Sequence, residues 1–250
     1  MLQEITVQGA SLNLLGIFVS TSYFRFLVLG GFGFFATHAS AGSFEEACAR
    51  QLPPTVIEVV PLYQEVATDY NVSYRNLTQI QLQGNVSHAG TRVLGITQAK
   101  MSSSARYGLT SLSQGTQGCA RPRLHITLSF APIRVFVGRE FVPGTCEFQL
   151  IFDHEVRHVK ADNDHLAFVA QKLQQELTQY FGNTVYYGNS QQLQQSWQDA
   201  VQQYWMPRAQ AWMKLVENRH AQIDTPAEYA RNNTACGGAV PRIIQQTEGR

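Results

Sequence analysis

The chain has 250 residues, and its 19 Lys and Arg side chains nearly balance 18 Asp and Glu, which leaves a formal net charge of +1. A balance so close to neutral argues against nucleic acid or an anionic membrane surface as a partner. Hydrophobic residues make up 44% of the chain, enough for one ordinary core, so we expect a single domain over residues 42–250.

Residues 1–41 have the pattern of an export signal. Arg25 precedes an apolar run over residues 26–36, and Ala39-Ser40-Ala41 forms an A-x-A cleavage site. A retained anchor is the alternative, but the run is too short to span a bilayer. We therefore expect a signal peptide cleaved before Gly42, a periplasmic or secreted protein, and no stable membrane insertion.

The chain has four cysteines, and an even number in an exported protein predicts two disulfides. Three pairings are possible. Cys119–Cys146 would clamp the strands that precede the central helix, and Cys48–Cys236 would tie the two ends together. No C-x-x-C spacing occurs, so a thiolate metal site is not favoured.

Between residues 42 and 137 the patterns predict short elements. We expect a helix within 42–54, strands over 55–60 and 66–74, a helix over 77–82, strands over 91–96 and 105–112, and a loop at 113–118. Strict alternation then marks strands over 124–130 and 133–137, and Pro132 between them predicts an antiparallel pair. The second strand is a candidate edge to which an extended peptide could add.

A long helix is predicted over residues 146–181, with Thr145 as its N-cap. Its apolar positions form a helical stripe that passes through His154, His158 and Asp162. These polar side chains are therefore expected to face the interior of the protein.

Residues 154–158, His-Glu-Val-Arg-His, form an HExxH motif. Positions i and i+4 lie one turn apart on one face of a helix, so His154 and His158 can bind one metal ion. Glu155 is rotated by about 100° and can reach a water on that ion as a general base. This is the zincin arrangement, and Zn²⁺ is the expected cofactor. The alternative for so short a motif is an exposed polar turn that binds no metal.

A zinc site of this kind needs a third protein ligand. A second helix over about 191–222, kinked at Pro207, is expected to run antiparallel to the first. In a hairpin centred near residue 186, Glu217 lies level with the histidines and is the favoured ligand, unless it forms a salt bridge at the helix end. The next candidates are Asp224 and His220.

A different site would form if the first helix broke at residues 162–164, which are poor helix formers. Asp164 or His165 could then complete a metzincin-like site. In an unbroken helix His165 lies about 16 Å along the axis from His154, too far for one ion. Asp162, one turn after His158, suits a contact with an imidazole N–H.

The C-terminal part has a second helix start. Thr225, Pro226 and Glu228 form a capping box for a short last helix. Gly237-Gly238 and the polar end beyond Ile244 predict a loosely held tail.

Three stretches carry a resemblance to a known family. They are residues 137–146 (Val-Gly-Arg-Glu-Phe-Val-Pro-Gly-Thr-Cys), the His-Glu-Val-Arg-His-Val helix, and residues 223–229 (Ile-Asp-Thr-Pro-Ala-Glu-Tyr) before a late Cys. With the signal, they resemble bacterial exported domains described as predicted zinc-dependent proteases, over roughly residues 50–236. The resemblance implies a zincin-like α+β fold: a small antiparallel or mixed sheet, the long HExxH helix, and a second long antiparallel helix. It implies His154, Glu155 and His158 as the functional residues.

The function we expect is therefore that of a zinc metallopeptidase acting on a peptide or protein of the cell envelope. Zinc would activate a water for attack on the peptide bond, with Glu155 as the general base. The alternative is a non-catalytic interaction module of the cell envelope that keeps a structural zinc site.

Overall fold

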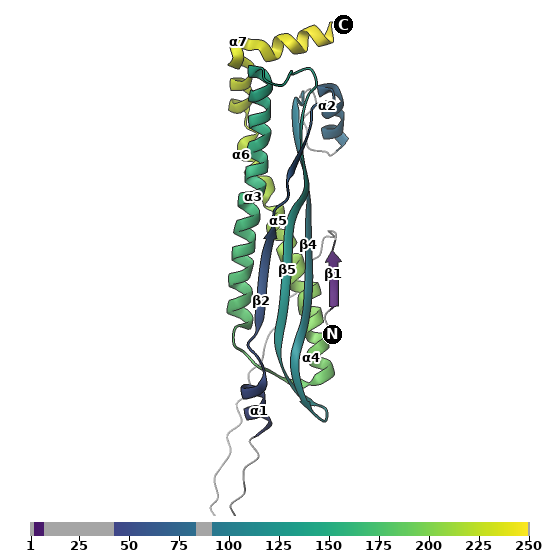
Figure 1. Cartoon of the computed structure of the whole chain (residues 1–250), viewed down its shortest axis with the longest axis vertical. Helices are drawn as coiled ribbons and strands as arrows, with labels where there is room; N and C mark the ends of the chain where they lie inside the picture. Colours follow the sequence, from purple (N-terminus) through teal and green to yellow (C-terminus); the bar gives the residue numbers. More distant parts are fainter. Residues whose placement is uncertain (1–2, 8–42, 84–91, 250) are drawn as a thin grey trace, which may run out of the picture.

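The computed structural model describes residues 3–7, 43–83 and 92–249. It shows an elongated α+β molecule in which one long helix lies along a narrow sheet (Figure 1). Apart from residues 3–7, the expected signal peptide over 1–41 and its cleavage site lie outside the described residues. Among the helices of the described ranges, none is long and apolar enough to cross a membrane.

The sheet is mixed and is built around one long strand, β5 (Gln117–Val137). Two strands pair antiparallel with β5 and two pair parallel with it, while one further strand pairs antiparallel with β4. The antiparallel partners of β5 are β4 (Gly95–Gln114) and β6 (Tyr186–Asn189). The parallel partners are β2 (Val56–Leu62) and β3 (Val66–Asp69), and β1 (Gln3–Val7) pairs with β4 over residues 103–107.

The β4–β5 hairpin differs from the predicted strands. The expected loop at 113–118 shrinks to a tight turn at Gly115, whose φ of +62° suits glycine. The predicted antiparallel pair at 124–130 and 133–137 is wrong, because both runs belong to β5. Pro132 has no N–H for the ladder, and the register shifts there, with Ala99 opposite Ile133 but Met101 opposite Phe130.

The strand at residues 133–137 is also not an exposed edge. Its residues pair with β3 on one side and with residues 95–99 of β4 on the other. A peptide cannot add to a strand whose two edges are both paired, so the expected binding edge is wrong.

Two short helices, α1 (Phe44–Gln51) and α2 (Tyr74–Gln83), accompany the sheet, and α3 (Cys146–Phe181) lies along it. Thr145 caps α3 as predicted, because its hydroxyl accepts a hydrogen bond from the Phe148 N–H at 3.3 Å. The helix continues unbroken through residues 162–164. Its buried face carries the predicted apolar stripe, from Phe148 to Phe181, and includes His154 and His158.

The return segment is a chain of helices rather than one kinked helix. It consists of α4 (Ser190–Asp199), the π-helix η1 (Ala200–Trp205), α5 (Met206–Lys214) and α6 (Val216–Ile223). The helix widens just ahead of Pro207, where the Met206 N–H bonds the Val201 carbonyl. The predicted irregularity at Pro207 is therefore confirmed.

The register of the return segment differs from the expected hairpin. Residues 186–189 leave the helical pair to form β6 on the sheet. Where the helices meet, Glu176 pairs with Arg208, and Asp162 pairs with His220. Glu155 thus lies level with the segment after Asp224, not with Glu217.

The two expected disulfides are present, but the pairs are not Cys119–Cys146 and Cys48–Cys236. Cys48–Cys119 joins α1 to β5, and Cys146–Cys236 joins the start of α3 to α7 (Pro226–Glu248). The bonded cysteines are 71 and 90 residues apart. In the chain-entropy model, loops of this size stabilise the folded state by about 4 kcal/mol each.

The C-terminal tail is held more firmly than predicted. After non-helical residues 235–238, α7 resumes. Val240 and Ile244 are buried in a cluster that includes Phe141 and Phe148. Glu248 forms an ion pair with Arg92 at 2.7 Å. The tail therefore packs against the end of the molecule that carries the start of α3.

Candidate metal centre

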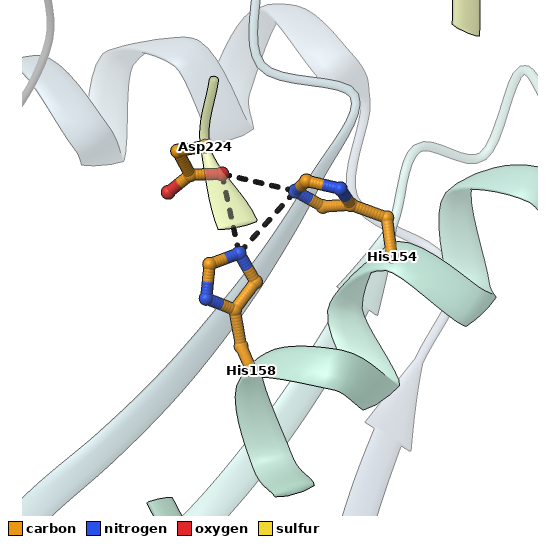
Figure 2. Close-up of side chains that lie close together, drawn as sticks. All are labelled: His154, His158 and Asp224. Carbon is orange, nitrogen blue, oxygen red and sulfur yellow. Dashed lines mark hydrogen bonds and ion pairs between the residues drawn. The ribbon is translucent and has the colours of Figure 1, made fainter. Parts of the chain in front are cut away.

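Three side chains converge at the N-terminal half of α3. The Nε2 atoms of His154 and His158 lie 3.3 Å apart, and Asp224 Oδ1 lies 3.0 Å from the first and 3.2 Å from the second (Figure 2). Both imidazoles are buried, while the Asp224 side chain is 39% exposed. Among the described residues this is the one group of at least three His, Cys, Asp or Glu side chains that could hold a metal ion.

The local sequence explains how the three groups meet. The i, i+4 spacing places both histidines on the buried face of α3. Asp224 lies at the junction of α6 and α7, where its backbone leaves the helical region. Thr225 then caps α7 by accepting a hydrogen bond from the Glu228 N–H at 3.2 Å. This cap fixes the turn that presents Asp224.

The separations fit a tetrahedral zinc ion. Ligands at the usual 2.0–2.1 Å from zinc lie about 3.3 Å from each other in a tetrahedron. The three separations in the protein, 3.0, 3.2 and 3.3 Å, are close to this value. Two imidazoles and one carboxylate also form a set that zinc binds in catalytic sites. The residues present therefore fit the expected ion.

The electrostatics favour a charged Asp224. Burial alone would raise its pKa, but the hydrogen bonds with His154 and His158 outweigh burial and lower the pKa well below the usual range. Burial likewise opposes protonation of His154, yet the hydrogen bond with Asp224 and the charge of Glu155 raise its pKa overall. A divalent cation requires the carboxylate ionised and both imidazoles neutral, so it would have to displace the proton that the raised pKa of His154 favours.

The Glu155 side chain lies near both histidines and contacts β4. The Thr97 hydroxyl lies 2.9 Å from Glu155 Oε2 and 3.0 Å from its backbone carbonyl oxygen. Gly95 lies against the same carboxylate: a Cβ on Gly95 would come within 2.7 Å of Oε1. Burial raises the pKa of Glu155, and the two nearby histidines partly offset this rise. Strand β4 thus holds the carboxylate in one place.

A second carboxylate, Glu228, lies behind His154. Its Oε1 is 3.5 Å from His154 Nδ1, and it also accepts hydrogen bonds from Arg157 and from Arg231. Arg157 Nη2 also lies 3.0 Å from His154 Nδ1, and a guanidinium can only donate, so Arg157 links Glu228 to the far side of the His154 ring. In the predicted capping box, the Glu228 side chain would accept a hydrogen bond from the Thr225 backbone N–H. It bonds Arg157 and Arg231 instead, so only the N-cap at Thr225 is confirmed.

Comparisons of the chain with protein-family models, with curated proteins and with solved structures found no significant match. No family is assigned on this basis. The resemblance to predicted zinc-dependent proteases therefore stays a prediction. The geometry of the site has to carry the functional argument.

The other ligand candidates occupy different places. Glu217 lies in the first turn of α6 and is not part of the candidate group, in which Asp224 stands beside the two histidines instead. His165 Nε2 donates a hydrogen bond to the carbonyl oxygen of Trp212 at 2.9 Å. Asp164 forms an exposed ion pair with Lys160. A metzincin-like site at the end of a broken helix is thus excluded by the continuous α3.

Asp162 contacts an imidazole, as expected, but not that of a metal-binding histidine. Its Oδ1 lies 2.8 Å from His220 Nε2, and this hydrogen bond raises the pKa of His220. The other oxygen of Asp162 is buried without a hydrogen-bond partner. The His220 ring lies edge-on to the His158 ring, with centroids 5.0 Å apart. His220 is therefore held beside the metal-binding group without belonging to it.

Sequence reasoning did not find two of the surrounding residues, Gly95 and Thr97, and it named Tyr229 only as a candidate, with His220, for stabilising an oxyanion. Gly95 and Thr97 are remote in sequence, and only the fold of β4 brings them to Glu155. Tyr229 hydrogen bonds to Asp224, and its pKa is raised by burial and then by the charge of that carboxylate. The stretch Asp-Thr-Pro-Ala-Glu-Tyr at residues 224–229 could have indicated these contacts, because it combines a helix N-cap with several polar side chains that need hydrogen-bond partners.

Proposed function

We propose that this protein is a zinc-dependent peptidase whose metal is held by His154, His158 and Asp224. The observation that carries the proposal is the near-tetrahedral spacing of these three ligand atoms on an HExxH helix. Three protein ligands leave a coordination position for water, as in catalytic rather than structural zinc sites. The half-exposed Asp224 leaves a side of this site open to solvent.

A bound zinc ion would supply Lewis acidity and a water that ionises near neutral pH. Glu155 would accept the proton of that water and deliver it to the leaving amine. Its buried environment suits this role, because desolvation raises its pKa toward the range in which a carboxylate can accept and release a proton. Thr97 and Gly95 would keep the carboxylate oriented.

Two further side chains are placed to stabilise negative charge on the carbonyl oxygen of a substrate. His220 is fixed by Asp162 and lies against His158. Tyr229 has its ring 6.2 Å from that of His154, and its hydroxyl is tied to Asp224. Donors held in advance by such contacts would cost little reorganisation during the reaction.

Strand β4 is the better candidate for binding an extended substrate. Residues 95–101 pair with β5 on one side, and within the described residues no strand pairs with their other edge, since β1 pairs only with 103–107. Thr97 in this stretch contacts the proposed general base. A peptide added to this edge would pass beside Glu155.

An extracytoplasmic location completes the proposal. Two disulfides connect distant parts of the chain. Such bonds persist in oxidising compartments, in agreement with the export signal that the sequence predicts. A periplasmic or secreted peptidase would meet proteins and peptides of the cell envelope as substrates.

The test combines zinc content with hydrolysis of casein and of peptidoglycan-derived peptides. Glu155→Gln should keep stoichiometric zinc and lose hydrolysis, whereas His154→Ala and His158→Ala should lose both. The difference follows from the roles, because ligands hold the ion and the base only moves a proton. Zinc loss in Glu155→Gln as complete as in the histidine variants would make Glu155 a ligand. Full zinc without any hydrolysis by the unaltered protein would indicate a structural site.

A further inference from the structure

A groove lies far from the metal centre, between the C-terminal half of α3 and the return helices. Its volume is about 410 Å³, within the range of about 300–1,000 Å³ that is usual for small-ligand sites. The lining residues are Glu176, Gln179 and Tyr180 of α3, Tyr204 and Trp205 of η1, and Arg208 of α5. Glu176 follows Glu155 by about 30 Å along the α3 axis, so the groove and the metal centre are separate.

Three aromatic rings form one wall of the groove. Trp205 is buried, and both tyrosines stand edge-on to it, Tyr180 with centroids 5.6 Å apart and Tyr204 with centroids 5.0 Å apart. The tyrosine side chains are nonetheless open to solvent, with exposed fractions of 66% for Tyr180 and 53% for Tyr204. The buried tryptophan thus supports two largely exposed rings, and Phe181 also packs against Tyr180 with ring centroids 4.9 Å apart. Exposed aromatic rings of this kind offer surface on which a ligand can stack.

The π-helix brings the two return-segment rings to this place. The helix widens ahead of Pro207, and Tyr204 and Trp205 are the last residues of the widened turn. π-helical turns are rare and often occur at functional sites. Pro207 gives a local cause for the turn, and the result is an aromatic wall beside α3.

The charges of the lining residues balance, because Glu176 is paired with Arg208 and the other lining residues are neutral, while Lys172 lies beside Glu176 outside the lining. Arg208 Nε lies 2.8 Å from Glu176 Oε2, and Lys172 lies 3.5 Å from Oε1. With the amide of Gln179, the lining offers a carboxylate acceptor, guanidinium donors and a group that does both. Because Glu176 and Arg208 already neutralise each other, the lining offers hydrogen-bonding groups without net charge, which suits a neutral ligand with many hydroxyls.

We propose that this groove binds a neutral oligosaccharide. A pyranose ring has an apolar C–H face that stacks on an exposed aromatic ring, and its hydroxyls both donate and accept hydrogen bonds. Tyr180 and Tyr204 supply the stacking faces, while Glu176, Gln179 and Arg208 supply the hydrogen-bonding groups. The site would attach the protein to glycan at one end of α3 and leave the metal centre at the other end free. The inference does not depend on the proposed peptidase activity.

The experiment is calorimetric titration of the full chain with chitotetraose, a neutral β-linked tetramer of N-acetylglucosamine. We expect saturable binding with an unchanged affinity in Glu155→Gln. Tyr180→Ala and Tyr204→Ala should each weaken binding by roughly five- to tenfold, since each removes one stacking face. Tyr187→Ala is the matched control, because this tyrosine is 49% exposed on β6 and does not line the groove.

Thermal unfolding of each variant checks that the fold is intact, and Gln179→Leu provides a variant that leaves the aromatic rings in place. Binding that is lost in the groove variants and kept in Tyr187→Ala supports the proposal. No heat of binding with chitotetraose at millimolar concentration would overturn it. Binding that all the variants retain would also overturn it. Aromatic grooves can also accept proline-rich peptides, so binding of such a peptide but not of the sugar would overturn it as well.

Discussion

Replacing Asp224 by alanine tests the part of the metal centre that the structure adds to the sequence motif. Asp224 Oδ1 lies 3.0 and 3.2 Å from the two imidazole nitrogens, so the substitution removes one of three ligands and the only negative charge among them. Changes around metal ligands typically cost 10–100-fold in affinity. Loss of a direct ligand should exceed that range, which corresponds to more than ~2.7 kcal/mol.

The assay is competition for zinc between the protein and a chromogenic chelator. Asp224→Asn keeps the size of the side chain and a carbonyl oxygen but removes the charge, so its loss should lie between that of wild type and that of Asp224→Ala. Glu217→Ala is the matched control, because this carboxylate lies in α6 outside the metal-binding group. An Asp224→Ala protein that binds zinc within tenfold of wild type, beside a Glu217→Ala protein that has lost it, would refute the reasoning.

Three further predictions concern Gly95 and Glu228 beside the candidate metal centre and Glu176 in the aromatic groove. Gly95→Ala would place a Cβ 2.7 Å from Glu155 Oε1 and so displace the carboxylate. It should abolish hydrolysis at full zinc occupancy and lower the free energy of unfolding, measured with denaturant, by roughly 1–3 kcal/mol. Turnover at the wild-type rate would contradict this prediction. Glu228→Ala should weaken zinc binding by about 10–100-fold in the chelator assay, because Glu228 holds Arg157 beside the His154 ring. Glu228→Gln should weaken it by less, since the amide oxygen still accepts hydrogen bonds from Arg157 and Arg231. Equal losses would show that the charge of Glu228 matters more. The hydrogen bond with Arg208 lowers the pKa of Glu176 in the folded protein. Glu176→Gln should therefore lose up to ~1 kcal/mol of stability at pH 7. This difference should be present above the unfolded pKa of ~4.3 and should disappear as the pH falls through the lower pKa that Glu176 has in the folded protein. A difference that persists in acid would contradict the ion pair.

The long helix and its buried polar face could be predicted because the signals are local. Thr145 gives the start of α3, and the apolar stripe gives both its length and the face on which His154 and His158 lie. Local patterns were also sufficient for the cap at Thr225 and for the irregularity ahead of Pro207. Each of these depends on residues within a turn or two of one another.

The third ligand could not be predicted because it depends on where two distant helices meet. A direct hairpin brings Glu217 to the histidines, but the chain inserts β6 into the sheet before it returns. The sequence around β6 does not determine by how many residues this insertion shifts α5 and α6 along α3. The same limit applies to β5, whose strand continues past Pro132 because four other strands pair along it. Disulfide pairing also required the complete fold.

The most direct test of the metal centre is a crystal structure of the zinc-loaded protein with anomalous data collected at the zinc edge. We predict one strong anomalous peak about 2.0–2.2 Å from His154 Nε2, His158 Nε2 and Asp224 Oδ1, with a water or a substrate analogue completing the coordination. A peak held by other side chains, or fully loaded crystals without density among these three residues, would contradict the account.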